Sequence, residues 1–543
     1  MDMQLDLDDI QGVVVKAYGS YGFPIARYLF FHIADPKAGR EFVKQILPLI
    51  TTAVPWPDPS KIPTEATNIA FTYQGLRKLE VPDATVHGFP DEFSMGMKAR
   101  RDIIGDTGPN HFCRWDPVWL TADEKTQDVH IIVTIDAKIY LKGDAKADKY
   151  LNDRYEEIVT IPEVVSEKVR LLKGHRGIVN GERKEDLSYQ AASGLPPKQE
   201  EKGYPGGKEH FGYSDGISTT YFQGCGEDSD LVIGGGKPVK GDPKTKEGWA
   251  PLEPGEFIFG HRDEAFEYPE APGPPLFSRN GTFMVYRKLH ENVGSFNSYM
   301  DAEGAKFPGG KEALAAKFAG RWRNGAPLVT FDTEEKANRY ISRFAELNLK
   351  ESKTEAEKVE FASLKLQLRA YDYDDDAEGA KCPFGAHIRR ANPRSALRFG
   401  NKKAFTDEPG ALSNRRRILR RGLPYGHSED PTRDDGDHGV IMMIINADLS
   451  RQFEFVQQQW FNFGNDFHLA NDQDPLLGNH GINENCRGEG RMVIEGDAET
   501  KPLQPPYLCS RMPTLVETRG GDYFFVPSLT CLRMIGLGII DPT

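Results

Sequence analysis

The segment 186–208 is the feature of this sequence that most constrains its fold, because it cannot contribute much to a hydrophobic core. It is rich in Gly, Pro, Lys and Glu, a composition typical of a connector. The chain has 543 residues, which is more than one ordinary core accommodates. We therefore predict an N-terminal domain over residues 1–200 and a C-terminal domain over residues 201–543.

The N-terminal part alternates patterns typical of strands with patterns typical of helices. Runs rich in Val, Ile and Phe predict strands at 12–18, 28–33, 68–73 and 129–137. Apolar residues at helical spacing predict helices at 36–49, 74–79 and 144–158. Elements in this order predict one α+β sheet domain with helices covering one of its faces.

A second unit of sheet and helices is predicted after the connector. Its strands are predicted at 282–289, 439–447 and 523–526, with a helix at 451–461. Charged helices at 311–318, 334–347 and 355–368 indicate an insertion around 300–370, and their Lys/Glu alternation indicates solvated faces. The similar plan of the two halves indicates a duplicated fold, although no sequence repeat proves it.

Charge and cysteine content argue against several classes of protein. The 68 Lys and Arg residues against 81 Asp and Glu give a net charge of −13, which disfavours nucleic acid and anionic membranes as partners. The six cysteines contain no CxxC pair, which argues against a disulfide framework and against a zinc site. Residues 1–9 are acidic, unlike a secretory signal, and Pro527 and Arg533 interrupt the apolar stretch 524–540. We expect a cytoplasmic protein, unless a processed form is exported.

The segment 382–394 contains His387 and, after it, several arginines. A neutral imidazole nitrogen can bind the iron of a haem, and guanidinium groups pair with carboxylates such as the two haem propionates. Arg389 and Arg394 are the candidates for that second role. A histidine beside basic residues is more often a solvated helix end, so this segment alone is weak support for a haem site.

Two other segments could carry chemistry. In 211–216, glycines bracket Asp215 and would let the backbone approach a flat ligand, although an ordinary turn has the same composition. In 420–426, Arg420 could stabilise developing negative charge in a pocket, whereas the alternative is a surface patch that includes the arginines at 415–417. The aspartates at 372 and 374–376 could bind a cation, but a solvated loop is the more typical structure.

Together and in this order, the three segments 212–216, 382–394 and 420–426 resemble those of the haem-dependent dye-decolourising peroxidases. The resemblance runs nearly end to end and includes 9–12, 68–73, 89–93, 104–106, 281–288 and 519–527. It implies an α+β fold of two ferredoxin-like domains, each an antiparallel sheet with helices, with haem b (iron protoporphyrin IX) in the C-terminal half. It also implies that His387 is the proximal iron ligand and that Asp215 and Arg420 lie on the distal side.

The resemblance implies further contacts with the cofactor. An acidic partner is expected behind the proximal imidazole, with Asp466 as the first candidate and Asp448 as the second. Arg389 or Arg394 would meet a propionate, and Gly216 would lie beside the cofactor. Many relatives have an aromatic residue on the strand that begins at 439, where this chain has Met442, which is either an oxidation target or core filling.

The function implied by the resemblance is a peroxidase that uses hydrogen peroxide to oxidise dyes, phenolics and other one-electron donors. Asp215 would take a proton from peroxide and Arg420 would stabilise the departing charge. Because an aspartate stays ionised where a histidine is already protonated, an acidic optimum is expected. The alternatives are a haem carrier or sensor without turnover and an interaction module without haem; a homo-oligomer is left open.

Overall fold

One antiparallel sheet runs through the residues that the computed structural model describes, which are 5–120, 128–141, 147–179, 182–226, 229–239, 248–397, 410–481, 489–496 and 504–540. Its strands follow the order β13-β14-β12-β17-β2-β3-β1-β4, and β7 also pairs with β1. They are β1 (Ile25–Ile33), β2 (Glu65–Phe71), β3 (Ile131–Ala137), β4 (Val169–Leu171), β7 (Gln190–Ser193), β12 (Thr282–Glu291), β13 (Leu419–Tyr425), β14 (Gly439–Asn446) and β17 (Val516–Val526).

The sheet consists of two units with the same strand order. Numbered within each unit along the chain, β1, β2, β3 and β4 lie in the order 4-1-3-2, and so do β12, β13, β14 and β17. This is the order of a ferredoxin-like βαββαβ unit, so the predicted duplicated α+β fold is confirmed. The units meet where β17 pairs with β2 through Phe525 and Phe71.

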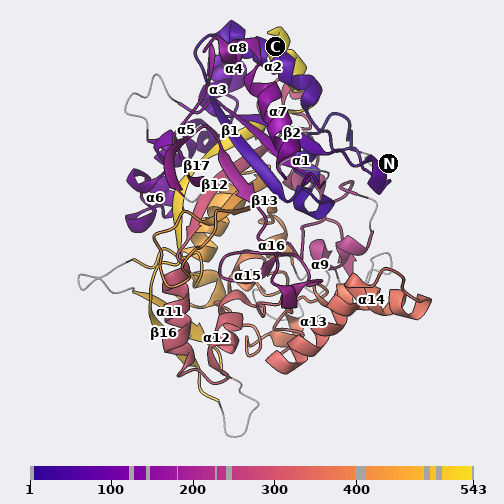
Figure 1. Cartoon of the computed structure of the whole chain (residues 1–543), viewed down its shortest axis with the longest axis vertical. Helices are drawn as coiled ribbons and strands as arrows, with labels where there is room; N and C mark the ends of the chain where they lie inside the picture. Colours follow the sequence, from indigo (N-terminus) through magenta and orange to yellow (C-terminus); the bar gives the residue numbers. More distant parts are fainter. Residues whose placement is uncertain are drawn as a thin grey trace.

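Helices form the crossovers of both units, and a further group of helices lies below the sheet (Figure 1). The N-terminal unit contains α1 (Gly12–Val15), α2 (Pro36–Ile46), α3 (Tyr73–Lys78), α4 (Asp83–Val86), α5 (Asp91–Ala99), α6 (Arg101–Ile104), α7 (Lys149–Val159) and α8 (Pro162–Val165). Later helices are α9 (Val232–Gly235), α10 (Pro275–Ser278), α11 (Val293–Gly304), α12 (Gly310–Ala319), α13 (Glu334–Leu349), α14 (Glu355–Gln367), α15 (His387–Ala391), α16 (Ala411–Asn414) and α17 (Leu529–Leu537). Two π-helical segments, Ser450–Glu454 and Val456–Phe461, follow β14.

Short two-stranded ladders accompany the main sheet. They are β5 (His175–Val179) with β6 (Glu182–Leu187), β8 (Gly207–Lys208) with β9 (Ser214–Asp215), β10 (Lys237–Pro238) with β11 (Trp249–Ala250), and β15 (Gly490–Ile494) with β16 (Tyr507–Met512). The ladder of β8 and β9 is the one that bears on function, because it carries Asp215.

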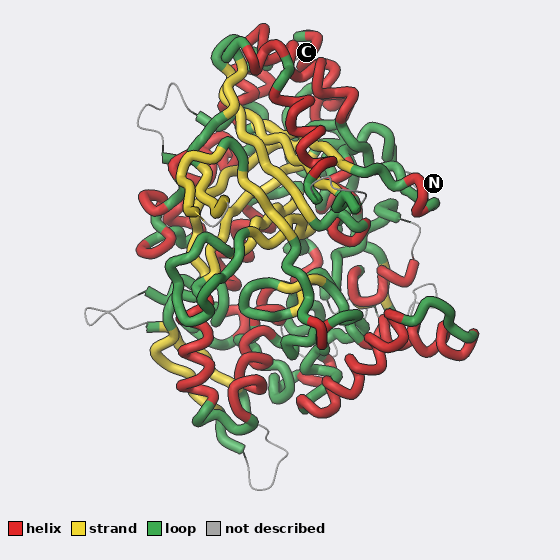
Figure 2. The backbone as a smooth tube through the Cα atoms, in the orientation of Figure 1, coloured by secondary structure: helices red, strands yellow, loops and turns green. Residues whose placement is uncertain are grey.

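The strands of the two units lie side by side in one sheet (Figure 2), and the hydrophobic core is continuous across both units. Strand β1 is almost completely buried, which explains why its sequence reads as a nearly unbroken apolar run instead of alternating with polar residues. Its Phe30 packs edge-on against Tyr286 of the C-terminal unit, with ring centroids 5.2 Å apart, and stacks on Phe524 at 6.4 Å. The sheet therefore acts as one rigid support for residues contributed by both halves.

Most predicted elements are confirmed, with shifts of a few residues at their ends, although β17 begins seven residues before the predicted 523 and the start of the helix predicted at 144–158 lies outside the described residues. The strand predicted at 12–18 is wrong: the run begins as helix α1, anchored by the buried Gln11 side chain, which hydrogen-bonds the backbone of Ile69 and Pro527. The connector 186–208 is not wholly irregular, because β7 lies in it and pairs with β1. The boundary near residue 200 stays a prediction.

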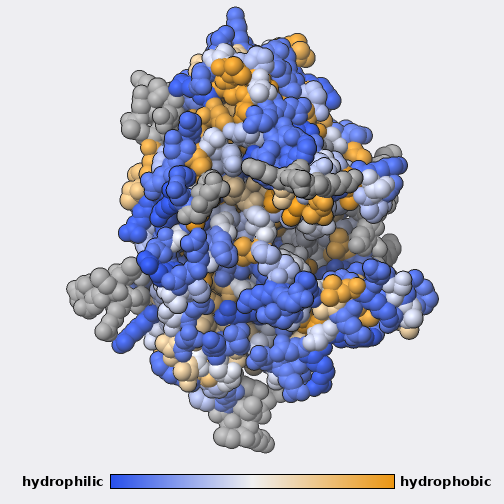
Figure 3. All heavy atoms as spheres, viewed as in Figure 1, coloured by the Kyte–Doolittle hydropathy of each residue, from blue (hydrophilic) through white to orange (hydrophobic). Residues whose placement is uncertain are grey.

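The last helix of the described chain packs against the N-terminal unit. Helix α17 packs beside α2 in the N-terminal unit (Figure 1), and Asp9 accepts the amides of Leu529 and Thr530. Polar residues cover most of the face shown in Figure 3, with apolar residues in separate patches. Within the described residues, no helix has the length and apolar character needed to cross a membrane.

Candidate active site

His387 is the first residue of α15, and its ring is held from one side. Its Nδ1 lies 3.0 Å from Oδ2 of Asp474, whose other oxygen accepts the amides of Leu476 and Leu477 at 2.9 and 2.8 Å. Burial acts to raise the pKa of Asp474, but His387 and the hydrogen bonds outweigh it and lower that pKa. Since Nδ1 engages the carboxylate, Nε2 is the nitrogen left to bind a metal.

The acidic partner of His387 is therefore Asp474, and the prediction of Asp466 is wrong. Asp466 accepts the indole N–H of Trp460 at 3.0 Å, and Asp448, the second candidate, accepts the amide of Arg451 at 2.8 Å. Asp474 follows Asp466 closely in sequence, and the Asp474-Pro475 pair is typical of a turn, which is the only sequence signal that could have pointed to it.

Asp215 and Arg420 form a bidentate ion pair across the cavity from α15. Strand β9 carries Asp215 and β13 carries Arg420, and the guanidinium nitrogens lie 2.7 and 3.1 Å from the two carboxylate oxygens. The side chains are 50% and 40% exposed, but to the cavity instead of the outer surface. Although burial acts to raise it, Arg420 lowers the pKa of Asp215 to about 2. Gly216, next in the chain, has a φ of 76°, a conformation that favours glycine.

One cavity is lined by His387 and by the Asp215–Arg420 pair. It lies between the C-terminal unit of the sheet and α15 with the π-helical segments that follow β14. The cavity has a volume of about 280 Å³, and the open space that includes its mouth is about 1770 Å³. The cavity volume is close to the lower end of the range of roughly 300–1,000 Å³ for small-molecule sites.

The lining of the cavity fits a flat, largely apolar group with anionic edges. Apolar side chains from the sheet and from the helical side contribute most of it: Leu289, Ile388, Val440, Met442, Ile444, Phe453, Val456, Phe461, Leu476, Leu477 and Val516. Four buried arginines also reach it: Arg287, Arg321, Arg394 and Arg417. A neutral imidazole, apolar walls and guanidinium groups are the donor set that a haem requires.

The structure corrects the prediction for Arg389. Its side chain is 1% exposed, pairs with Asp376 at 3.0 Å and donates to the carbonyl of Cys382 at 2.6 Å. Arg389 is absent from the lining of the cavity, whereas Arg394 lines it while donating to the carbonyl of Arg369 at 2.6 Å. The predicted solvated acidic loop is wrong for Asp376, which is buried, whereas Asp375 is exposed.

The remaining predicted cofactor residues lie at the edge of the same space. Met442 lines the cavity as predicted from its strand position. Gly216 lines a second cavity of about 790 Å³. This cavity meets the first at Asp215, Arg420 and Met442. Gly216 therefore borders the distal side and not the walls of the first cavity.

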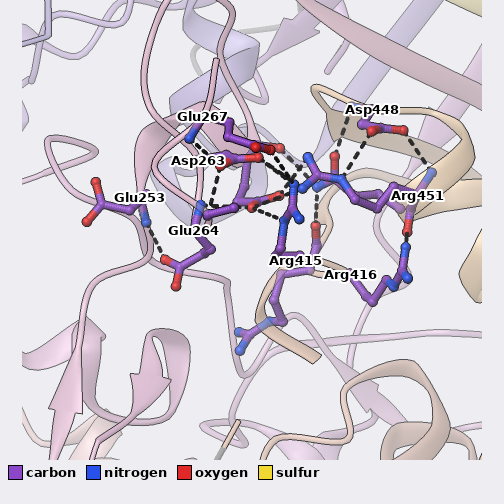
Figure 4. A network of polar contacts seen from close by, with 12 residues as sticks. Glu253, Asp263, Glu264, Glu267, Arg415, Arg416, Asp448 and Arg451 are labelled. Carbon is purple, nitrogen blue, oxygen red and sulfur yellow. Dashed lines mark hydrogen bonds and ion pairs between the residues drawn. The ribbon is translucent and has the colours of Figure 1, made fainter. Parts of the chain in front are cut away.

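Arg415 and Arg416 belong to a partly buried polar network (Figure 4), and Arg417 is buried, so the arginines at 415–417 do not form a free surface patch. Arg415 and Arg451 both pair with Asp263, at 2.8 and 3.1 Å, and Arg416 donates to the carbonyl of Arg451. Arg417 donates to the carbonyls of Gly235 and Gly236 at 2.8 and 3.1 Å. These contacts fix the chain directly before β13, and so fix where Arg420 enters the cavity.

Comparisons with known proteins agree with this geometry. Residues 9–170 match the family model of the DyP dimeric alpha+beta barrel domain. The chain is 24% identical to Peroxidase 2 of Mycetinis scorodonius, covering 97% of this chain and 87% of that protein. It is 26% identical to a dye-decolorizing peroxidase of Mycena epipterygia, covering 98% and 88%. The solved structure of an ancestral D-type dye decolorizing peroxidase superposes with a TM-score of 0.67 at 26% identity, covering 98% of this chain and 99% of that one.

Proposed function

Because this chain belongs to the dye-decolourising peroxidase family, we propose that it is a haem peroxidase that oxidises dyes, phenolics and other one-electron donors with hydrogen peroxide. Each peroxide molecule would take two electrons from two donor molecules and two protons, and yield two water molecules. The observation that carries the proposal is that His387, Asp215 and Arg420 line one cavity. A solved dye-decolorizing peroxidase in complex with 2,6-dimethoxyphenol supports phenolics as donors.

The cofactor proposed for this cavity is haem b. His387 Nε2, oriented by Asp474, would bind its iron, and Arg394 would pair with a propionate. Bound haem supplies the redox-active iron at which the peroxide O–O bond is cleaved and through which donor electrons pass. The apolar walls exclude water from this space, which strengthens the electrostatic effect of each charged group inside it.

Asp215 and Arg420 would handle the proton and the charge. Asp215 would accept the proton of the peroxide oxygen that becomes bound and pass it to the oxygen that leaves. A carboxylate with a pKa of about 2 holds a proton only transiently, which suits transfer between two oxygens of one molecule. Arg420, already oriented by Asp215, would stabilise negative charge on the leaving oxygen.

Absorbance spectra before and after peroxide, followed by peroxide-dependent dye bleaching, test the function directly. A haem spectrum with bleaching supports the peroxidase. A carrier or sensor would show the haem spectrum and bind peroxide without bleaching, and an interaction module would be colourless when supplied with haem. Either of these two results would overturn the proposal.

The pH dependence follows from the lowered pKa of Asp215. The ionised carboxylate is the active form, so the rate that depends on it is lost as pH falls through about 2 and is retained above that value. A histidine base would already lose activity below about pH 6.5. We expect kcat/KM for peroxide, which reports the free enzyme, to hold through mildly acidic pH. An acid limb with its midpoint near that of histidine, while circular dichroism shows an intact fold, would contradict the assignment of Asp215.

Replacing Asp474 by asparagine is expected to weaken haem binding or activity by about 10- to 100-fold. The asparagine can still accept the amides of Leu476 and Leu477, but it offers a carboxamide where His387 Nδ1 needs a carboxylate. The ligand would then donate less electron density, and the haem reduction potential should rise. Potentiometry and haem titration measure both effects.

The matched control is Asp466→Asn, which removes the same charge close by but contacts Trp460 instead of His387. Its reduction potential should equal that of the wild type. If the two variants behave alike, Asp474 has no particular role in orienting His387.

A cytoplasmic location stays a prediction, and a homo-oligomeric assembly stays open. Cell fractionation and light scattering of the purified holoenzyme would test them.

A further inference from the structure

Two glutamates line the same cavity as Asp215 and are not used in the mechanism proposed above. Glu291 is the last residue of β12 and is 6% exposed. Glu209 directly follows β8 and opens the turn that leads to β9. In this ladder Gly207 pairs with Asp215, so the turn between them is short and its geometry determines where Asp215 lies.

The two carboxyl groups hold this turn by its amides. Glu209 accepts the amide of Phe211 at 2.8 Å with one oxygen and the amide of Tyr213 at 2.6 Å with the other. Glu291 accepts the amide of His210 at 3.1 Å. Three backbone donors of one turn are thus satisfied by two side chains that lie deep in the protein, so disturbing either side chain disturbs the turn.

The two carboxyl groups lie next to each other, because they accept the amides of the adjacent residues His210 and Phe211. Burial raises the pKa of both, and the charges of Glu209 and Asp215 raise that of Glu291 further, well above its ordinary range. Among the described residues, neither carboxyl forms an ion pair with a lysine or arginine. Since both oxygens of Glu209 already accept amides, Glu209 is the ionised partner and Glu291 keeps the proton.

The surrounding groups do not offset a second negative charge. Burial lowers the pKa of three flanking histidines, which are therefore neutral near pH 7: His210 and His438, each to about 4, and His290. The cationic groups of the same region already have carboxylate partners: Arg420 has Asp215, Arg323 has Glu312, Arg519 has Glu517, and Lys208, which precedes Glu209, has Glu201. Ionising both glutamates would place two adjacent carboxylates beside Asp215 without compensation.

We propose that Glu209 and Glu291 hold one proton between them and act as a positioning pair for Asp215, which loses its place beside Arg420 when that proton is lost at high pH. A carboxyl whose pKa is raised by folding stabilises the fold while protonated, and this contribution is lost as pH rises through the raised value. The pair would therefore set the alkaline limb of the pH profile. The inference rests on the proposed role of Asp215 in the peroxidase reaction.

The variant Glu291→Gln removes the titratable proton and keeps the shape of the side chain. Glutamine keeps a donor for Glu209 and an acceptor for the amide of His210, but it does not ionise. The wild-type rate should fall in alkaline solution, and the rate of Glu291→Gln should not. Glu209→Gln cannot accept both amides, so it should lose about 10- to 100-fold at every pH through misplacement of Asp215. The control Glu312→Gln removes a carboxylate that pairs with Arg323 near the same turn, and it should keep the alkaline decline.

Hydrogen exchange of the peptide 207–215 provides a second readout, which does not depend on activity or on haem. After correction for the intrinsic effect of pH, its protection should fall at high pH in the wild type and in Glu312→Gln, but persist in Glu291→Gln. Equal alkaline loss of protection in the wild type and in Glu291→Gln would overturn the positioning pair. Absence of peroxidase activity with the predicted exchange pattern would overturn the proposed function alone.

Discussion

Replacement of Asp215 by asparagine is expected to lower the peroxide-dependent rate by about 10²- to 10⁴-fold, the usual contribution of a proton-transferring side chain. Asparagine has nearly the same shape, but its amide cannot take up the peroxide proton. It also cannot pair with Arg420 through two ionic hydrogen bonds, as the carboxylate does. Because His387 and the cavity walls are unchanged, haem content should remain that of the wild type. Bleaching rates at varied peroxide concentration measure the first effect, and absorbance spectra measure the second.

A matched control for this variant is Asp301→Asn. Asp301 is 64% exposed and pairs with Lys311 at 2.9 Å, so the same chemical change there removes only a surface interaction. Its rate should equal that of the wild type. A loss smaller than about tenfold in Asp215→Asn, with haem fully bound, would show that another group moves the proton.

The sequence motifs identified functional residues that lie beside an unusual backbone conformation or at the start of a helix. Asp215 is followed by a glycine in the left-handed conformation, and His387 stands at the first position of a short helix. Such requirements leave a trace in the sequence near the functional residue itself. The strands were readable for a similar reason, because β1 and β3 are buried on both faces and need continuous apolar runs.

Contacts between distant segments left no such trace. Asp474 meets His387 only because the chain after the π-helical segments folds back against α15, and no local pattern distinguishes it from Asp466. Glu209 and Glu291 likewise meet only because their segments pack around one cavity. In each case the partner is selected by tertiary packing, which the spacing along the chain does not encode.

Arg389 shows how closeness in sequence can mislead. It lies two residues after His387 in the same helix, and residues two apart on a helix point to nearly opposite sides. If His387 faces the cavity, Arg389 must face away from it, toward Asp376, as the structure has it. Arg394 lies beyond the end of α15 and escapes this restriction, which is why it can line the cavity.

His387→Ala is expected to weaken haem binding by more than about 100-fold, since losing even the outer partner of a metal ligand costs 10- to 100-fold. The variant removes the nitrogen left free to bind iron and retains the apolar walls. Haem titration followed by absorbance measures the loss. Free imidazole should restore part of the binding by occupying the vacated space, a rescue that a collapsed cavity would not show. The control His87→Ala changes an exposed histidine outside the cavity and should bind haem like the wild type. Wild-type affinity and an unchanged spectrum in His387→Ala would mean that iron is held elsewhere, and the assignment of Asp215 and Arg420 to the opposite face would lose its basis.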